Sequence, residues 1–285
     1  MSDTNFYRAF ENKFRGSREL IKSRLEQYLP FVKPLSEIYT DARTFDVGCG
    51  RGEWLQLMKK HGFKSFGVDL DQGMLDACDE LNLDASQGNA IEYLKGLDSD
   101  SQVIVSAFHV VEHILFEDLQ CLVREALRVL KPGGLLIMET PNPENIKVAS
   151  ENFYLDPTHI KPIPAMLLEF IPEYYGYYRT KVVRLQEPSE YINREKLSLS
   201  EVINGVSPDY AVIAQKSADN EILKLFDSIY SADFGLSIES ATAKFESRLI
   251  NIESKLLKAT EKSIEAQDKA DKSEAKVIDA EAKVI

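Results

Sequence analysis

Between residues 43 and 141, short apolar runs alternate with amphipathic stretches, and this alternation is the strongest constraint on the fold. Strands are predicted at 44–48, 65–70, 101–108 and 135–140, with a helix after each of the first three. Strands that alternate with helices of about ten residues predict βαβ units, in which helices cover both faces of a parallel sheet. We therefore expect a doubly wound, Rossmann-like α/β fold.

The segments on either side are less regular. Apolar spacing near 3.6 residues predicts a helix in the first 40 residues, with Ser17 as a candidate N-cap and Pro30 and Pro34 expected to end it. After residue 141 the chain is rich in proline, so 153–164 is predicted to be a loop. A helix at 165–176 and two strands then complete the globular part. The two strands are predicted at 178–186 and 209–217.

From Thr242 onward proline and glycine disappear, and small or apolar residues recur at alternating spacings of three and four. This a/d heptad pattern predicts a coiled coil, and it runs to the last residue, so a longer coil is expected beyond Ile285. A single solvated helix is the alternative, because the later core positions are Ala and Ser. The predicted a/d residues are Thr242, Phe245, Leu249, Ile252, Leu256, Ala259, Ser263, Ala266, Ala270, Ser273, Val277, Ala280 and Val284. The predicted domains are a helical cap (1–40), the α/β domain (41–217), a linker (218–241) and the coiled coil (242–285).

Composition excludes several classes of function. The formal net charge is −12, which argues against a nucleic-acid partner because phosphate binding requires clustered Lys and Arg. The three cysteines form neither a CxxC pair nor a disulfide framework, which favours a reducing cytoplasm. The N-terminus lacks the apolar core of a signal peptide, and no apolar run is long enough to span a membrane. We therefore expect a cytoplasmic protein without a transmembrane segment.

The glycine-rich stretch DVGCGRG opens directly from the first predicted strand. Gly48, Gly50 and Gly52 let the backbone bend and approach a ligand closely, at the carboxyl edge where open α/β sheets bind nucleotides. Asp69 ends the next strand, nineteen residues after Gly50, and a carboxylate there is placed to accept both hydroxyls of a ribose. The alternative role for Asp69 is to cap the helix that follows.

The same stretch discriminates among nucleotides. The glycines follow GxGxG rather than the GxGxxG of dinucleotide enzymes, and no Gly-Lys-Ser/Thr of a P-loop is present. Asp46, before the first glycine, suits a ligand with positive charge better than a pyrophosphate. A sulfonium with an amino-acid tail is such a ligand, so S-adenosylmethionine (SAM) is the predicted cofactor.

Five motifs occur in the order and spacing of class I SAM-dependent methyltransferases, which the chain resembles over about residues 40–217: FDVGCGRG, GVDLD, QGNAIEYL, VSAFHVVEHI and LRVLKPGGLLIMETPNP. The resemblance implies a seven-stranded sheet whose last strand is antiparallel. Relatives often have Asp where this chain has Asn89, whose side chain can still hydrogen-bond the exocyclic amine of adenine. The cofactor-binding residues implied by position are Asp46, Gly48, Cys49, Gly50, Asp69, Leu70, Asn89, Ala90 and Phe108.

Histidines cluster in the segments that would face the donor methyl. His109, Glu112 and His113 have the spacing of one face of a helical turn, and an imidazole suits the base that O-methylation of a hydroxyl needs. His159 is a second acceptor-side candidate, and Asp156 could orient it, act as the base itself, or form a turn before the following proline. His113 resembles the Glu-His pair with which relatives contact the cofactor region. Each histidine taken singly could be structural. No metal is expected, since no cluster has convincing ligand spacing.

A narrower resemblance links the chain to methyltransferase modules of bacterial lipopolysaccharide O-antigen assembly, in which chain-terminating members carry coiled coils. It implies methylation of a sugar hydroxyl of a surface polysaccharide or its lipid-linked precursor, a homo-oligomer, a glycosyltransferase as candidate partner, and a peripheral position at the inner membrane. The alternatives are an O-methyltransferase for a small quinone precursor and a non-catalytic scaffold. Candidate sugar-site residues in the N-terminal segment are Phe6, Tyr7, Arg8, Phe14, Arg15 and Arg18.

Overall fold

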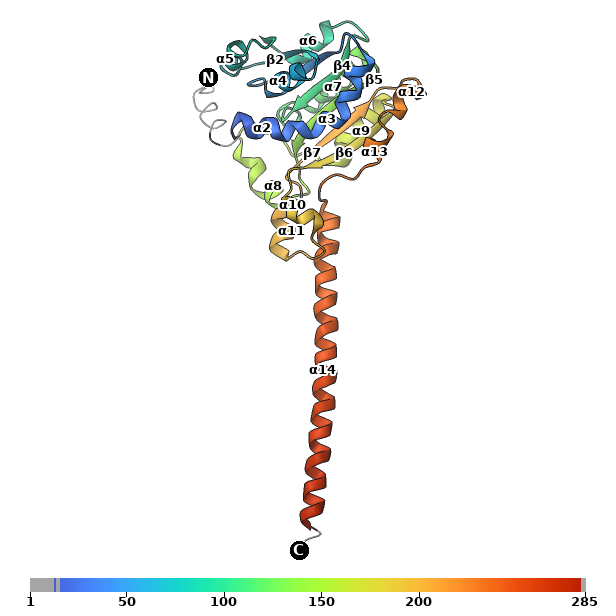
Figure 1. Ribbon diagram of the computed structural model, residues 1–285. Helices are drawn as coiled ribbons and strands as arrows, with labels where there is room; N and C mark the ends of the chain where they lie inside the picture. The colour runs from blue at the N-terminus through green and yellow to red at the C-terminus, as the bar shows by residue number, and fades with distance from the viewer. Residues whose placement is uncertain (1–12, 14–15, 283–285) are drawn as a thin grey trace.

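The computed structural model describes residue 13 and residues 16–282. In this part of the chain one sheet carries a helical layer on each face, and a long helix projects from the body (Figure 1). The predicted α/β fold is confirmed, including the antiparallel last strand. None of the described helices is long and apolar enough to cross a membrane. Residues Phe6, Tyr7, Arg8, Phe14 and Arg15, predicted as sugar-site candidates, lie outside the described residues.

The sheet has seven strands in the order β3-β2-β1-β4-β5-β7-β6. All neighbours are parallel except β7, which runs antiparallel to both β5 and β6. Its first residue therefore lies at the edge where the other strands end. The strands are β1 (Arg43–Val47), β2 (Lys64–Asp69), β3 (Ala85–Gln87), β4 (Gln102–Phe108), β5 (Leu130–Pro141), β6 (Arg179–Leu185) and β7 (Asp209–Gln215).

Side-chain alternation along the central strands builds two cores. Leu136 and Met138 of β5 pack on one face with α6 (Ala90–Gly96), α7 (Phe116–Val129) and α9 (Ala165–Tyr175). Leu135 and Ile137 pack on the other face with α3 (Leu29–Ile38) and α4 (Glu53–Lys60). Both faces of these strands are buried, as expected for a sheet covered by helices on each side. The longer helices are α2 (Arg18–Leu25), α3 (Leu29–Ile38), α4 (Glu53–Lys60), α5 (Gln72–Glu80), α6 (Ala90–Gly96), α7 (Phe116–Val129) and α9 (Ala165–Tyr175). The short helices are η1 (Glu26–Tyr28), η2 (Val111–His113), α8 (Ile146–Ser150), η3 (Asn152–Leu155), α10 (Ser189–Asn193), α11 (Leu199–Gly205), α12 (Asn220–Lys224) and α13 (Asp227–Ser231).

The N-terminal helical segment differs from the expectation in one respect. Ser17 caps α2 as predicted, but Pro30 and Pro34 do not end the helical run. The break occurs earlier, at η1, so Pro30 falls in the first turn of α3, where a missing N–H leaves no hydrogen bond unmade. Phe31 and Leu35 of α3 are fully buried against the sheet, and this packing holds Pro34 inside the helix.

The segment 218–241, expected as a linker, is folded against the domain. It contains α12 and α13, and Phe226 is buried in the same core as α3 and α4. Helix α14 (Ile238–Ala282) begins four residues before the predicted start of the coil. Its first turns pack on α11 through Ala241 and Phe245, and the rest extends away from the body (Figure 1).

Candidate active site

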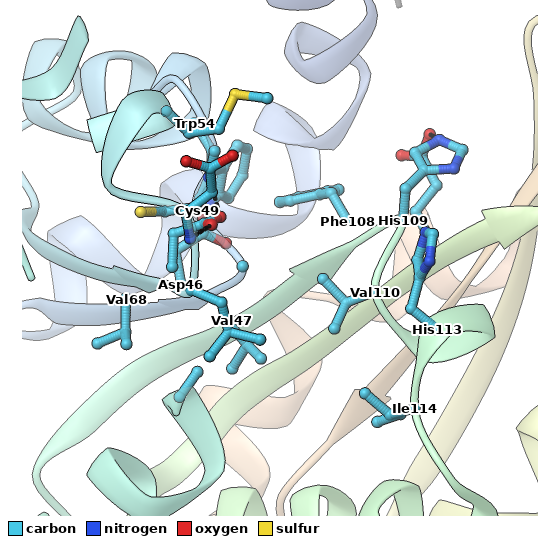
Figure 2. Close-up of a pocket in the computed structure, with 18 of the residues that line it drawn as sticks. Asp46, Val47, Cys49, Trp54, Val68, Phe108, His109, Val110, His113 and Ile114 are labelled. Carbon is cyan, nitrogen blue, oxygen red and sulfur yellow. Dashed lines mark hydrogen bonds and ion pairs between the residues drawn. The ribbon is translucent and has the colours of Figure 1, made fainter. Parts of the chain in front are cut away.

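A cavity of about 860 Å³ opens at the carboxyl edge of β1, β2, β4 and β5. This volume lies within the range of ~300–1,000 Å³ that is usual for ligand pockets. Figure 2 shows Asp46, Cys49 and Trp54 on one side and His109 and His113 on the other, with Phe108 between them. The cofactor-binding and catalytic candidates from the sequence all line this cavity: Asp46, Gly48, Cys49, Gly50, Asp69, Leu70, Asn89, Ala90, Phe108, His109, His113, Asp156 and His159. Arg18, a predicted sugar-site candidate, is not in the lining; its guanidinium donates to the carbonyl of Arg51 at 2.6 Å and lies 3.6 Å from Glu53.

The glycine loop between β1 and α4 has its own hydrogen bonds. The N–H groups of Gly48 and Cys49 both donate to the carbonyl of Val68, at 2.8 and 3.2 Å, and Gly52 donates to Cys49. Gly48 has φ +68°, and a Cβ there would lie 2.6 Å from a methyl of Val110, so glycine is required. Because these amides are already satisfied, this loop suits a ligand held by side chains better than a pyrophosphate held by backbone N–H groups.

Two carboxylates follow the expected pattern. Asp46 is 2% exposed and accepts a hydrogen bond of 2.6 Å from the Ser106 hydroxyl. Asp69 accepts one backbone N–H at each carboxylate oxygen, from Gly50 at 2.8 Å and from Asp71 at 2.9 Å. Each oxygen of Asp69 has a second lone pair for a ribose hydroxyl. The alternative role of Asp69 as a helix cap is excluded, because Asp71 is the N-cap of α5.

The side chain of Asn89 is partly used by the fold. Its Oδ1 accepts from the N–H groups of Ile91 and Glu92 and so caps α6. The sequence-based expectation that Asn89 accepts a hydrogen bond from the exocyclic amine of adenine assumed a free oxygen. The free group is Nδ2, which donates, so Asn89 suits a ring nitrogen of adenine instead. Cys49 is 4% exposed, and a hydrogen bond with Cys78 together with burial raises its thiol pKa, so it is no nucleophile.

Arg24 and Trp54 also line the cavity and were not predicted to be site residues. Arg24 of α2 is the one Lys or Arg among the described lining residues, and its guanidinium makes no hydrogen bond or ion pair within the described chain. The indole N–H of Trp54 is buried and has no partner among the described residues. Both are donors that could hold the carboxylate of a SAM molecule. The helical periodicity of the sequence predicts the helix that contains Arg24 but not that this helix crosses the edge of the sheet, so Arg24 could not be predicted as a site residue.

His109 adopts an unusual backbone conformation, with φ +54°, and its ring lies among carboxylates. Its Nδ1 is 3.2 Å from Glu112, and its Nε2 is 3.3 Å from Glu139 and 4.0 Å from Asp209. Burial lowers the pKa of His109, but the hydrogen bonds with Glu112 and Glu139 outweigh it and raise the pKa well above its usual value. His109 is therefore protonated at neutral pH, and neither ring nitrogen has a lone pair to take a proton.

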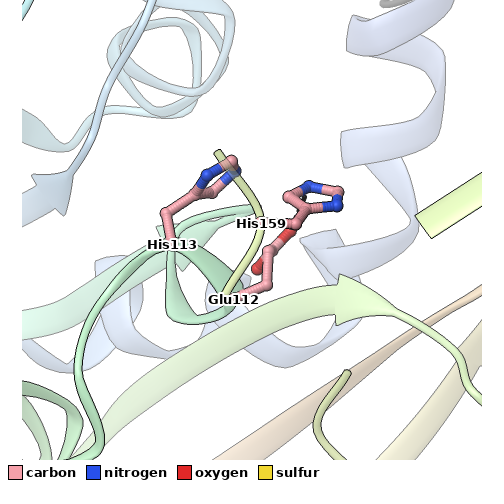
Figure 3. Close-up of side chains that lie close together, drawn as sticks. All are labelled: Glu112, His113 and His159. Atoms are coloured by element: carbon pink, nitrogen blue, oxygen red, sulfur yellow. Dashed lines mark ion pairs between the residues drawn. The ribbon is translucent and has the colours of Figure 1, made fainter. Parts of the chain in front are cut away.

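The predicted helical face shared by His109, Glu112 and His113 does not form. Helix η2 is a single 3₁₀ turn, and the positive φ of His109 directs its ring to Glu139, whereas the ring of His113 meets His159 at a centroid distance of 4.6 Å. Burial lowers the pKa of His113, as does the proximity of His159, which keeps His113 neutral. Figure 3 shows the rings of His113 and His159 close together beside Glu112.

Hydrogen bonds define the tautomers of both rings. Nδ1 of His159 is 2.6 Å from the carbonyl of Phe153, so this nitrogen carries a proton and donates it to the carbonyl, which leaves Nε2 as the ring nitrogen without a hydrogen bond. The Thr158 hydroxyl donates to Asp156 at 2.6 Å, so its oxygen accepts from Nδ1 of His113 at 2.9 Å. Asp156 also accepts the Thr158 N–H, which is the predicted turn, and its other oxygen is 4.0 Å from Nε2 of His159.

Two groups of side chains bring metal-ligand atoms within 4.8 Å of one another in the described chain. In the group of His109, Glu139 and Asp209, the ring of His109 is an imidazolium that interacts with the carboxylates, and an imidazolium cannot bind a metal. In the group that Glu112 forms with His113 and His159, the Glu112 carboxylate accepts a hydrogen bond from Thr140 at 2.9 Å and one from His109. Both arrangements are accounted for as hydrogen-bond networks. The groups are Glu112, His113 and His159, and His109, Glu139 and Asp209.

The fold and the site define an enzyme that binds a nucleoside cofactor carrying positive charge at the edge of a doubly wound sheet. A methyltransferase-domain family model matches residues 45–138. A SAM-dependent methyltransferase from Archaeoglobus fulgidus has a similar structure, with TM-score 0.65 and 36% identity over 74% of this chain and 100% of that one. Because that match covers the whole relative, the chain belongs to the class I SAM-dependent methyltransferases, and SAM is its cofactor.

Curated relatives match over shorter stretches. A probable S-adenosylmethionine-dependent methyltransferase from Mycolicibacterium smegmatis is 30% identical over 46% of this chain and 50% of its own length. The ubiquinone biosynthesis O-methyltransferase of Coxiella burnetii is 31% identical over 34% of this chain and 42% of its own length. The chain thus spans half or less of the length of these two curated relatives.

Proposed function

We propose that this chain is an O-methyltransferase that acts on a sugar hydroxyl of a bacterial surface polysaccharide, at the terminal residue of the glycan. SAM supplies an electrophilic methyl group when bound. Asp46 is placed to hold its amino group, Asp69 its ribose and Arg24 its carboxylate. The observation that carries the proposal is the pair of imidazole rings, His113 and His159, whose centroids lie 4.6 Å apart at the cavity wall.

We assign the role of base to His159. The carbonyl of Phe153 holds its Nδ1–H, so the lone pair of Nε2 faces the cavity and can take the proton of a hydroxyl. Glu112 and Asp156 each lie 4.0 Å from Nε2, and their negative charge stabilises the imidazolium that forms. The positive charge of His109 lies between the carboxylates of Glu112 and Glu139 and reduces the repulsion between them. Ile160 fixes the loop beneath, because its N–H donates to the carbonyl of Glu112 at 2.8 Å.

The test is transfer of labelled methyl groups from SAM to a short O-antigen oligosaccharide with a free non-reducing end. Wild-type protein should label the glycan, and His159→Ala should bind SAM normally in calorimetry while turning over ~10²–10⁴-fold more slowly. His61→Ala is the matched control, because His61 ends α4 and does not line the cavity. Absence of SAM binding would favour the scaffold alternative, and full activity of His159→Ala would remove the base assignment.

A quinone precursor is the second candidate acceptor. It is supported by the similarity to a protein named ubiquinone biosynthesis O-methyltransferase, which matches over part of the domain. The same assay with a phenolic quinone precursor separates the two, since labelling of the phenol without labelling of the glycan would reverse the assignment. A quinone precursor as the acceptor would not explain the extended helix α14.

We further propose that α14 pairs with α14 of a second copy, as the heptad pattern predicts. Leu249 and Leu256 of that pattern are 42% and 66% exposed. A second heptad row of four exposed apolar residues lies at the b positions, on a face of the helix outside the a/d seam, and was not predicted from the sequence. Sedimentation of the full chain should show an oligomer that Leu256→Lys converts to monomer, whereas Glu261→Lys, at an exposed f position away from the seam, should not. The second row is Ile250, Leu257, Ile264 and Ile278.

A further inference from the structure

Four polar side chains meet at the end of the cavity opposite the glycine loop, and we call them the acceptor wall: His109, Glu139, Gln186 and Asp209. They come from four separate places in the sequence. His109 follows β4, Glu139 lies near the end of β5 and Gln186 follows β6. Asp209 joins them because β7 is antiparallel, so its first residue pairs with Leu185 and Pro141 at the carboxyl edge.

Two members of the acceptor wall are fully engaged. Glu139 accepts a very short hydrogen bond from the buried Tyr28 hydroxyl at one oxygen. Its other oxygen lies 3.3 Å from His109 and 3.4 Å from the Gln186 amide nitrogen. His109 is held between Glu139 and Glu112. Neither residue has a free group to recognise a ligand without breaking this network.

The other two members keep hydrogen-bond acceptors without donors. The side chain of Asp209 is 15% exposed and makes no hydrogen bond to another described residue, and its nearest cation, His109, is 4.0 Å away. The Oε1 atom of Gln186 is buried and has no partner in the described chain. Gln186 also has φ +69°, an uncommon conformation for a residue other than glycine, of the kind that gathers at ligand sites. An acceptor left without a donor in a nearly buried wall is costly unless a ligand supplies one.

We propose that Asp209 and Gln186 accept hydrogen bonds from hydroxyl groups of an uncharged sugar next to the hydroxyl that is methylated, and that they reject acceptors with a phosphate or carboxylate at that position. This inference rests on the proposed function and specifies its substrate class. Hydroxyl groups supply the missing donors. A phosphate at neutral pH offers mainly acceptors, so it would place lone pairs and negative charge against Asp209.

The charges around the wall support this selectivity. Eight acidic side chains line the cavity, against the single Arg24. The amides of Gly48, Cys49 and Gly50 are occupied, so Arg24 and the Trp54 N–H are the donors proposed for the carboxylate of the cofactor, and Arg24 bound to it no longer attracts an anionic acceptor. His109 is already balanced by Glu112 and Glu139. The eight are Asp46, Glu53, Asp69, Asp71, Asp118, Glu139, Asp156 and Asp209.

The experiment measures acceptor binding to the protein loaded with S-adenosylhomocysteine, which occupies Arg24. Calorimetry compares a neutral oligosaccharide with the same oligosaccharide phosphorylated beside the acceptor hydroxyl. We expect the phosphorylated form to bind about tenfold or more weakly, since like charges brought together oppose association. In Asp209→Asn the neutral glycan should lose about tenfold in affinity, and the difference between the two glycans should shrink. Asp100→Asn removes the same charge at the opposite edge of the sheet, where Asp100 pairs with Lys216, and should change neither affinity.

Three outcomes decide the matter. Preference for the neutral glycan that depends on Asp209 supports the inference. Equal or tighter binding of the phosphorylated glycan overturns it, while methyl transfer to that glycan would leave the proposed function standing. Binding of a phenolic diol but of neither glycan overturns both the inference and the glycan assignment.

Discussion

Replacing Asp209 by Asn should make the protein more stable at neutral pH, although the residue lies in the site. Burial raises the pKa of Asp209 from 3.8 to about 6, with Glu139 adding to the effect while His109 and Arg24 oppose it. Between these two pH values the folded protein keeps a proton that the unfolded chain has released. Stability therefore falls as the pH rises from about 4 to 6, because ionised Asp209 is disfavoured in the fold.

The magnitude follows from that pKa difference. About two pH units at 1.36 kcal/mol each give a cost of about 3 kcal/mol at pH 7.5, which the neutral amide avoids. For a chain of this size the gain corresponds to roughly 6–12 °C in Tm. Near pH 5 it should fall to about half, since wild-type Asp209 is then largely protonated in the fold.

Urea unfolding of both proteins at pH 7.5 and near pH 5 checks this expectation. The exposed Asp100→Asn should stay within about 0.5 kcal/mol of wild type at either pH. No gain in Asp209→Asn at pH 7.5, or a gain that is the same at both pH values, would refute the reasoning. If Asp209→Asn is more stable than wild type but binds the glycan more weakly, the wild-type protein keeps Asp209 for recognition and is less stable for it.

Three further predictions concern the cofactor and the network. Asp69→Ala should reduce SAM affinity by about 100-fold or more in calorimetry, because hydrogen bonds to a charged acceptor are lost, and Asp76→Ala, at an exposed position of α5 outside the cavity lining, should not. Gly48→Ala should abolish SAM binding, because its φ of +68° and the contact with Val110 force the loop to move; near-normal affinity would disprove the requirement for glycine. His109→Ala should lower the free energy of unfolding by about 1 kcal/mol in urea, because it leaves Glu112 and Glu139 without their cation while water screens the 43% exposed ring, and an unchanged midpoint would contradict the imidazolium assignment.

Local patterns in the sequence were enough to predict the fold, the cofactor and the edge of the sheet at which the glycine loop, Asp46 and Asp69 meet. The alternation of strands and helices requires a parallel sheet, and Gly48, Asp46 and Asp69 lie at strand ends that must meet at one edge. Asp69 follows Gly50 by nineteen positions, and its carboxylate accepts a hydrogen bond of 2.8 Å from the N–H of Gly50. Such contacts join neighbouring strands, so their geometry follows from the order of the chain.

The acceptor half depended on tertiary structure. His109, Glu139, Gln186 and Asp209 are far apart in sequence, and only the antiparallel insertion of β7 between β5 and β6 brings Asp209 to the edge. The protonation of His109 likewise depends on Glu139, thirty residues away and on the next strand. By itself the sequence determined which cofactor the chain binds, because short-range motifs build that site. Only the tertiary structure decided that His109 lies among carboxylates that raise its pKa, because a pKa is set by the charges and burial that long-range packing brings together.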